Sequence, residues 1–234
     1  MLVLAIDTAS SFCSAALLDS AAGRTLAVRS EDIGRGHAER LMGMIDDVLD
    51  EAGLSFASIQ RIGVTVGPGS FTGIRVGVAA ARGLALALRV PCLGVTTLEA
   101  LAAGVADRAP RGSPIMAVLD ARRSEYFCQA FSPSGEPLTE AMALGLDATA
   151  ALARRHGAVL VGSGAKAIAD RLADKTSSVP AVDPTPGLDI VAVARIAAER
   201  SPTSPPSPLY LRGADAKPQE GFALAHADAT GKTA

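Results

Sequence analysis

The amino-acid sequence predicts an α/β protein built from two halves, each with a mixed sheet flanked by helices. In the first half, an apolar strand over 61–66 leads through a glycine-rich loop over 67–73 into a long helix. In the second half, a short strand over 158–161 leads through the glycine turn 162–164 into another helix. At the N-terminus, the apolar run Leu2–Asp7 is followed by two further runs at hairpin spacing, which adds antiparallel strands to the sheet.

The order of apolar runs in the first half predicts β-β-β-α-β-α-β-α, a mixed sheet with helices packed on it. Apolar residues at helical spacing indicate the helix over 37–52, and Gly53 provides its stop signal. Either Thr96 or Thr97 supplies the N-cap of the last helix. The expected elements are strands over 2–7, 12–19, 24–31, 61–66 and 91–95, and helices over 37–52, 72–88 and 98–106.

A break over 110–114, with a proline at each end, separates the two halves. Four prolines within 201–208 exclude a helix and an inner strand there, and the residues from 214 onward are small and polar. The second half is expected to hold strands over 115–120, 126–131, 158–161 and 209–212, and helices over 147–156, from the glycine turn to 173, and over 188–200. We expect three parts: a first lobe over 1–109, a second lobe over 110–213 and a mobile tail over 214–234.

Composition excludes several classes of protein. The 234 residues carry a net charge of −2 and 3% aromatic residues, unlike a nucleic-acid-binding surface. The N-terminus has no basic segment before its apolar run, and the run over 83–88 is too short to span a bilayer. Cys13, Cys92 and Cys128 lie in apolar runs, so reduced core thiols in a cytoplasmic protein are expected. The sequence contains no His-x-x-x-His or Cys-x-x-Cys pair, so no metal site is expected.

Two segments have the composition of phosphate-binding turns. The first contains Asp7, Thr8 and Ser10 at the end of a strand, where a carboxylate can hold a metal-bound water and hydroxyls can meet a phosphate. The second contains Gly67, Gly69 and Ser70 directly before a helix, whose free N–H groups and dipole favour an anion. Both segments also fit tight polar turns with no ligand.

Other residues offer weaker signals of a site. Arg75, in the first turn of the long helix, could add positive charge to the preceding loop. Gly162 and Gly164 could pack against an adenosine, although ordinary strand-to-helix turns use the same residues. His37 is expected on the surface near a helix cap. No nucleophile–base set stands out, which argues against a peptidase and leaves an ATP-dependent phosphotransferase of the sugar-kinase type as the alternative function.

The long helix over 72–88 has almost no polar face, because its only polar side chains are Thr72, Arg75 and Arg82. A helix that is apolar all round is normally buried all round, so either the second lobe or another protein must cover the side away from the sheet. Small residues on this helix let a second helix approach, and the methionines of 37–52 suit an adaptable contact. The residues expected at a partner interface are Leu41, Met44, Ile45, Val48, Gly73, Ile74, Gly77, Val78, Ala81, Arg82 and Ala85.

Taken together, these segments resemble the TsaB (YeaZ) family, a bacterial component of tRNA threonylcarbamoyladenosine synthesis. The resemblance covers about residues 1–213, and its most specific part is the block 67–77 in register with the N-terminal Asp7-Thr8. The matching segments are 4–9, 37–41, 67–77, 83–85, 94–98, 119–122 with 125–126, 162–164 and 208–212.

The resemblance implies a two-lobed actin/Hsp70/sugar-kinase-like (ASKHA) fold with no catalytic activity of its own. TsaB-like proteins are regarded as relatives of TsaD, the subunit that transfers threonylcarbamoyl to adenosine 37 of ANN-decoding tRNAs. TsaD-like proteins carry a metal-binding His-x-x-x-His, whereas here His37 is followed four residues later by Leu41.

The resemblance also implies partners. Family members pair with themselves or with TsaD through two helices that correspond to 37–52 and 72–88, and the ATPase TsaE joins the complex. A scaffold subunit that dimerises with TsaD is therefore the first expectation. It would contact tRNA only through the complex, and ATP or ADP would bind only together with partners.

Overall fold

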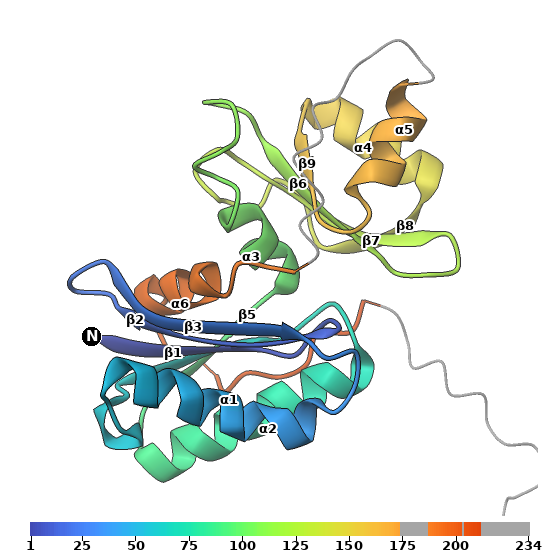
Figure 1. Cartoon of the computed structure of the whole chain (residues 1–234). Coiled ribbons are helices and arrows are strands. Elements are labelled where there is room, and N and C mark those ends of the chain that lie inside the picture. The colour runs from blue at the N-terminus through green and yellow to red at the C-terminus, as the bar shows by residue number, and fades with distance from the viewer. Residues whose placement is uncertain (174–186, 203, 212–234) are drawn as a thin grey trace, which may run out of the picture.

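The computed structural model describes residues 1–173, 187–202 and 204–211. Two sheets form two lobes, one above the other in Figure 1. The first has the strand order β3-β2-β1-β4-β5, and the second has the order β8-β7-β6-β9. The strands of the first sheet are β1 (Leu2–Asp7), β2 (Phe12–Asp19), β3 (Arg24–Asp32), β4 (Arg61–Thr65) and β5 (Cys92–Val95).

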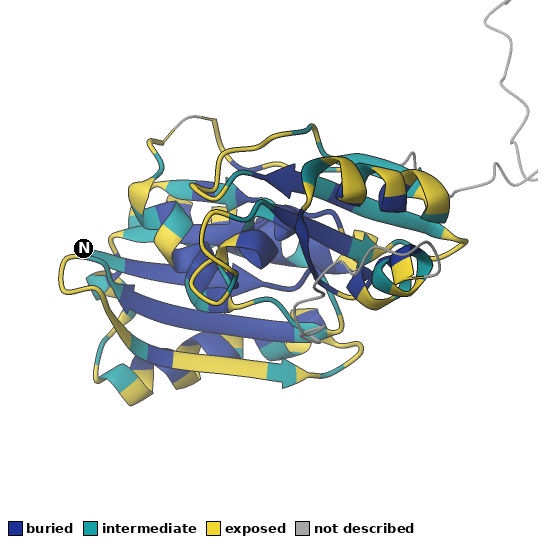
Figure 2. Cartoon of the chain, turned by 90° about the horizontal axis from the view of Figure 1, so that it is seen from above, coloured by how far each residue is buried: buried dark blue, intermediate teal, exposed yellow. Residues whose placement is uncertain are grey.

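The first sheet is covered on both faces. Helices α1 (His37–Ala52) and α2 (Phe71–Leu88) lie on one face, and α3 (Thr97–Ala103) and α6 (Ile190–Glu199) lie on the other (Figure 1). Strand β1 pairs antiparallel with β2 and parallel with β4, so it sits at the centre and is almost wholly buried. The edge strand β3 is largely exposed (Figure 2). Two-sided cover explains why β1 and β4 are nearly continuous apolar runs.

The second sheet packs helices on one face and α3 on the other. Helices α4 and α5 bury the side of the sheet that contains Met116 and Leu160. Helix α3 lies between the two sheets, and its Leu98 and Leu101 pack with Ile115 of the second sheet. The elements are β6 (Ile115–Asp120), β7 (Glu125–Phe131), β8 (Met142–Gly145), α4 (Leu146–His156), β9 (Val159–Val161) and α5 (Ala165–Ala173), and the first lobe adds the short 3-10 helix Phe56–Ser58.

Most expected elements are confirmed, with boundaries that differ by a few residues. Gly53 is the left-handed C-cap of α1, and Thr96 caps α3 in a capping box with Glu99. Strand β8 was not expected, because its four residues carry no alternating pattern. His37 was expected on the surface, but it is 9% exposed and its Nε2 lies 3.2 Å from the carbonyl oxygen of Phe12. The expected strand over 209–212 is wrong for its described residues 209–211, which form no strand, and the tail 214–234 lies outside the described residues.

The chain returns to the first lobe after the second sheet is complete, which does not match the expected second lobe of 110–213. Helix α6 packs on β1, β2 and β4. One terminal nitrogen of Arg61 in β4 donates hydrogen bonds at 2.8–2.9 Å to the carbonyls of Ala197, Ala198 and Arg200, at the C-terminal end of α6. A helix that packs on a sheet distant in the chain carries no sequence signal of where it docks, so the sequence does not predict that α6 belongs to the first lobe.

The two sides of α2 differ sharply. Ten of the eleven residues expected at a partner interface are core residues of this chain, and only Arg82 lies on its surface. For α2 the expectation failed because a nearly uniform apolar helix gives no periodic signal of which side meets the sheet. For α1 it failed because the apolar stripe packs into the core of this chain and not against a partner. The ten core residues are Leu41, Met44, Ile45 and Val48 of α1 and Gly73, Ile74, Gly77, Val78, Ala81 and Ala85 of α2.

The outward side of α2 is a single helical stripe. It contains Phe71, Arg75, Ala79, Arg82 and Leu86, which are spaced three or four residues apart, and Leu86 is 82% exposed. By length and composition alone, α2 would also qualify as a membrane span, with a mean hydropathy of 1.4. A core helix of a soluble protein can have the same composition, and here one side of α2 packs on the sheet.

Two glycines of α2 should respond in opposite ways to alanine. A Cβ on Gly77 would lie 2.4 Å from Thr8 Oγ1, whereas a Cβ on Gly83 would meet nothing within 4 Å. We expect Gly77→Ala to lower the free energy of unfolding by about 1–3 kcal/mol through overpacking. Gly83→Ala should raise it by about 0.5–1 kcal/mol through helix propensity. Urea unfolding of both variants tests this, and equal effects would contradict the assigned packing of α2.

Candidate functional site

The two candidate phosphate turns of the first lobe are docked against each other. The backbone N–H of Ser70 donates to the carbonyl of Ala9 at 2.7 Å, and the Thr8 hydroxyl donates to the carbonyl of Gly73 at 2.7 Å. A Cβ on Gly69 would lie 2.1 Å from the Ala9 oxygen, and a Cβ on Gly73 would lie 2.0 Å from the Thr8 oxygen. These glycines are therefore required by close backbone contact within the protein.

This docking occupies groups that would otherwise meet an anion. The N–H of Ser70 is bonded to Ala9, and the N–H of Gly73 is bonded to the Ser70 hydroxyl at 3.2 Å. The carbonyl oxygens of Thr8 and Ala9 also bring partial negative charge to the start of α2. An anion at this helix N-terminus would meet those oxygens as well as the helix dipole.

Asp7 lies beneath these turns and is 1% exposed. Its Oδ1 accepts hydrogen bonds from the Thr65 hydroxyl at 2.5 Å and from the N–H of Ala9 at 3.0 Å. Burial raises the pKa of the Asp7 carboxyl above its ordinary value, while these hydrogen bonds and the nearby His37 act in the opposite direction. Asp7 therefore holds the turn from below and does not reach the open surface.

The glycine turn of the second lobe is also shaped by close packing. Gly162 has φ +101°, and a Cβ there would lie 2.5 Å from the Val118 carbonyl oxygen. A Cβ on Gly164 would lie 2.8 Å from the Tyr126 ring. Between them, the Ser163 hydroxyl accepts a hydrogen bond from the N–H of Asp120 at 3.1 Å. The two glycines fit this turn onto β6 and β7.

A cleft of about 730 Å³ opens between the two lobes where these turns meet. Of the eight residues expected at a phosphate site, Ser10, Gly69 and Ser70 line it and the other five do not. The remaining lining residues are Ala9, Ser11, Gly34, Pro68, Phe71, Thr97, Leu119, Asp120, Ala121, Arg122, Phe127, Ser163, Leu209, Tyr210 and Leu211. Turns at the strand ends of both lobes therefore converge on one cavity.

The turn between β6 and β7 was not identified as part of a site. Arg122, Arg123 and Ser124 all have positive φ, at 61°, 54° and 61°. Each costs about 1–2 kcal/mol relative to the right-handed conformation. Arg122 lines the cleft, and its backbone N–H donates to Asp120 Oδ1 at 2.7 Å. Arginine is an unusual residue for this conformation, so the sequence carried no signal of the turn.

The C-terminal segment 204–211 forms a strap across the first lobe to the mouth of the cleft. The Leu209 N–H donates to the Val66 carbonyl at 2.7 Å, and a Cβ on Gly67 would lie 2.9 Å from the Leu209 oxygen. Gly67, with φ +104°, therefore makes room for the strap. Leu209 packs with the first core and Leu211 packs with the residues between the lobes, so the strap contacts both lobes.

Arg75 belongs to the surface and not to the glycine loop that it was expected to charge. Its guanidinium lies 3.7 Å from the centre of the Phe71 ring, and its Nε donates to the Tyr210 hydroxyl at 2.9 Å. The Phe71 and Tyr210 rings are 5.2 Å apart, centre to centre. Phe71 and Tyr210 are each 43% exposed. The strap is thereby tied to the first turn of α2.

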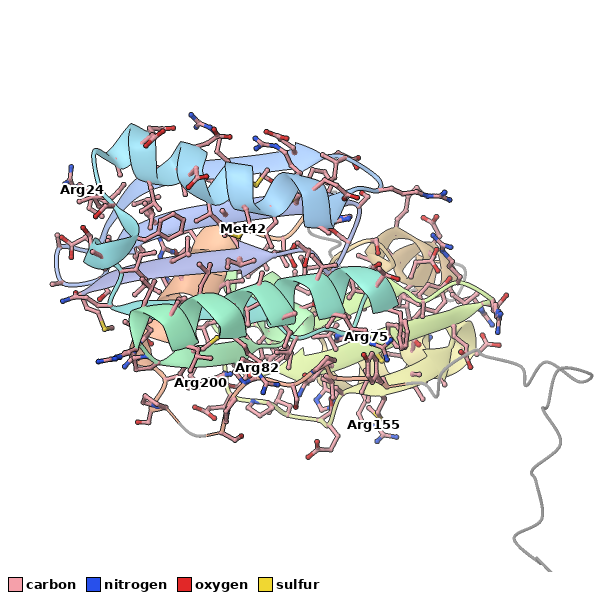
Figure 3. The ribbon with its side chains drawn as sticks, turned by 90° about the horizontal axis from the view of Figure 1, so that it is seen from below. Arg24, Met42, Arg75, Arg82, Arg155 and Arg200 are labelled. Atoms are coloured by element: carbon pink, nitrogen blue, oxygen red, sulfur yellow. The ribbon has the colours of Figure 1, made fainter. Side chains whose placement is uncertain are left out.

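The two helices below the first sheet present opposite charges to solvent. Helix α1 exposes Glu39, Asp46 and Asp50, whereas α2 contains no acidic residue and exposes Arg75 and Arg82. Figure 3 looks onto these helices, with Met42 on α1 and both arginines along α2. Met42 and Leu86 add exposed apolar area at 42% and 82%. Helices α1 and α2 thus form one surface with exposed apolar side chains on both helices, acidic residues on α1 and basic residues on α2.

Metal-ligating and nucleophilic groups do not gather at either place. Within residues 1–173, 187–202 and 204–211, no group of three or more His, Cys, Asp and Glu side chains could hold a metal ion. Cys13 and Cys128 are buried and Cys92 is half-buried, and burial raises the pKa of each thiol to about 11. At neutral pH these cysteines are protonated and poorly nucleophilic.

Comparisons with known proteins identify the family. A family model described as "TsaD: tRNA N6-adenosine threonylcarbamoyltransferase" matches residues 28–195. The chain is 39% identical over 127 residues to the tRNA threonylcarbamoyladenosine biosynthesis protein TsaB of Escherichia coli, covering 54% of this chain and 53% of that protein. An uncharacterized protein of Mycobacterium tuberculosis is 32% identical over 92% of this chain and 94% of its own.

A crystal structure from Pseudomonas aeruginosa completes the comparison. It is described as an uncharacterized protein with similarity to peptidase YeaZ, and it matches with a TM-score of 0.74 and 30% identity over 90% of this chain and 99% of its own. The chain belongs to the TsaB (YeaZ) family. It also belongs to the wider family that the TsaD model describes, and it spans about half the length of the first curated TsaB relatives it matches.

The fold is confirmed as the two-lobed actin/Hsp70/sugar-kinase-like one. The ROK hexokinase from Thermus thermophilus superposes with a TM-score of 0.52 at 15% identity, covering 85% of this chain and 98% of its own. At that identity the likeness concerns the fold alone.

The buried Asp7 generates a pH-dependent prediction. A raised pKa in the folded state means that this group contributes stability at low pH, which is lost as pH rises through the folded-state pKa. As pH falls from 7 towards 4, the unfolding free energy of the wild type should therefore rise relative to that of Asp7→Asn. The rise should be about 1.4 kcal/mol for each unit by which the Asp7 pKa in the folded state exceeds its pKa in the unfolded state. Urea unfolding across this pH range measures it, and a flat difference would contradict the raised pKa.

The docked turns generate a second prediction. We expect the isolated chain to bind ATP·Mg with a Kd weaker than about 1 mM, because the loop amides are bonded within the protein. Isothermal titration calorimetry measures this directly. Micromolar binding by the chain alone would contradict it and favour the phosphotransferase alternative.

Proposed function

We propose that this chain is a non-catalytic scaffold subunit in the formation of threonylcarbamoyladenosine at position 37 of ANN-decoding tRNAs. Its partner is the threonylcarbamoyltransferase TsaD, which it supports as a dimer partner while threonylcarbamoyl-AMP serves as donor. Membership of the TsaB family and the match to the TsaD family model support a role in this pathway. The protein is proposed to act in the cytoplasm and to meet tRNA through the complex.

The observation that carries the dimer proposal is the outward stripe of α2 beside the acidic side of α1. A stripe that exposes Phe71, Arg75 and Leu86 places aromatic, arginine and aliphatic side chains together, and the first two types are enriched at protein interfaces. The neighbouring carboxylates of α1 add an opposite charge, which would fix the orientation of a partner. A partner that presents basic side chains to α1 and acidic side chains to α2 would complement both helices at once.

The surface is also compatible with self-association. A two-fold pairing of two copies would place α1 of one opposite α2 of the other, so acidic and basic sides would meet twice. We propose that a homodimer and the TsaD heterodimer compete for this surface. The ATPase TsaE and bound ATP or ADP would join only after the heterodimer has formed.

The interface is tested by two matched substitutions. Leu86→Asp places a charge on the most exposed apolar side chain of the α2 stripe, whereas Leu138→Asp changes an exposed leucine of the second lobe, 45% exposed. We expect Leu86→Asp to weaken heterodimer formation with the cognate TsaD by about tenfold or more. Leu138→Asp should leave it within about twofold.

Sedimentation equilibrium with purified TsaD measures both affinities, and thermal unfolding checks that each variant remains folded. Leu86→Asp should also reduce tRNA modification in the reconstituted system, in proportion to the lost heterodimer. Undiminished binding by Leu86→Asp would overturn the assignment of the surface.

A further inference from the structure

The end of the α2 stripe nearest the cleft differs from the rest of that surface. Arg75 and Arg82 both lie on the stripe, seven residues apart, and both are exposed. Only Arg75 is held in place, by the Phe71 ring beneath its guanidinium and by the Tyr210 hydroxyl on its Nε. Tyr210 belongs to the strap and lies 135 positions after Arg75 in the chain.

The way Arg75 is held leaves its other donors available. Its Nε is used by Tyr210, and among the described residues no hydrogen bond or ion pair engages its two terminal nitrogens. Stacking fixes the planar guanidinium, so the side chain has already lost the rotamer entropy that an arginine usually loses on binding. Two parallel N–H groups on one edge match the two oxygens of a carboxylate.

We propose that Phe71, Arg75 and Tyr210 form a preorganised anchor that binds a carboxylate side chain of the protein docked on α2. This inference rests on the proposed function, since the docked protein is the TsaD subunit named there. Within the anchor, Arg75 contacts the partner, and Tyr210 is a positioning residue that acts through Arg75. The strap therefore contributes to the interface although it belongs to neither helix.

The surroundings favour a protein carboxylate over a nucleic-acid phosphate. Beside α2, the exposed Glu39, Asp46 and Asp50 of α1 would repel a phosphate backbone. Along the stripe, Ala79 and Leu86 offer apolar contact, which suits the core of a protein interface. A carboxylate at Arg75 would thus sit at the edge of an apolar contact, where desolvation strengthens a bidentate pair.

Lysine substitutions distinguish the effect of the preorganised anchor from the effect of positive charge alone. Arg75→Lys keeps the positive charge but loses the planar stack and the Nε bond, so the Kd of the heterodimer should rise about tenfold or more. Arg82→Lys is the matched control, because Arg82 has neither contact, and its Kd should change less than about threefold. Tyr210→Phe keeps the ring and removes only the hydroxyl, so the Kd should rise about three- to tenfold.

The experiment uses the full chain and its cognate TsaD, with affinities from surface plasmon resonance and thermal unfolding as the check on folding. The effect of Arg75→Lys should persist at about 1 M NaCl, where the Debye length is about 3 Å and long-range attraction is screened. Equal affinities for wild type and Arg75→Lys, or equal losses at Arg75 and Arg82, would overturn the anchor and leave the scaffold proposal standing. Absence of binding by the wild-type chain would overturn both.

Discussion

The close docking of the β1 turn onto the start of α2 is the contact on which the rest of the molecule depends. Thr8 and Ala9 approach the backbone of Gly69 and Gly73 so closely that no Cβ fits between them. This contact sets the direction in which α2 leaves the sheet, and so decides which side of the helix enters the core. It also forms the floor of the cleft, and it occupies loop amides that a phosphate would need.

The sequence was informative where local chemistry decides the outcome. Caps such as Gly53 and Thr96, and the apolar runs of β1 and β4, follow from short-range rules, and the order of elements followed from them. The sequence also indicated glycine turns at strand ends in both lobes, and of these residues Gly69 and Ser70 line the cleft. It could not say that the glycines serve backbone contact, since close packing and ligand binding require the same residue.

Features that depend on distant parts of the chain could not be predicted. The return of α6 to the first sheet and the bond from Arg75 to Tyr210 join residues more than a hundred positions apart. The inward side of α2 was equally hidden, because glycine and alanine occur on both of its sides. The exposed stripe therefore shares only Arg82 with the eleven residues that the sequence predicts at the interface.

The return of α6 makes the second lobe an insertion within a continuous first lobe. Its entrance and exit are adjacent, because a Cβ on Gly104 would lie 3.0 Å from Cβ of Asp189. A short linker between these positions could replace the whole second sheet without moving α6. Such a minimal chain would lack Val105 and would expose Leu98 and Leu101 of α3, which now pack between the sheets. Replacing these two leucines with polar residues would give a single-lobed protein that still presents the α1–α2 surface.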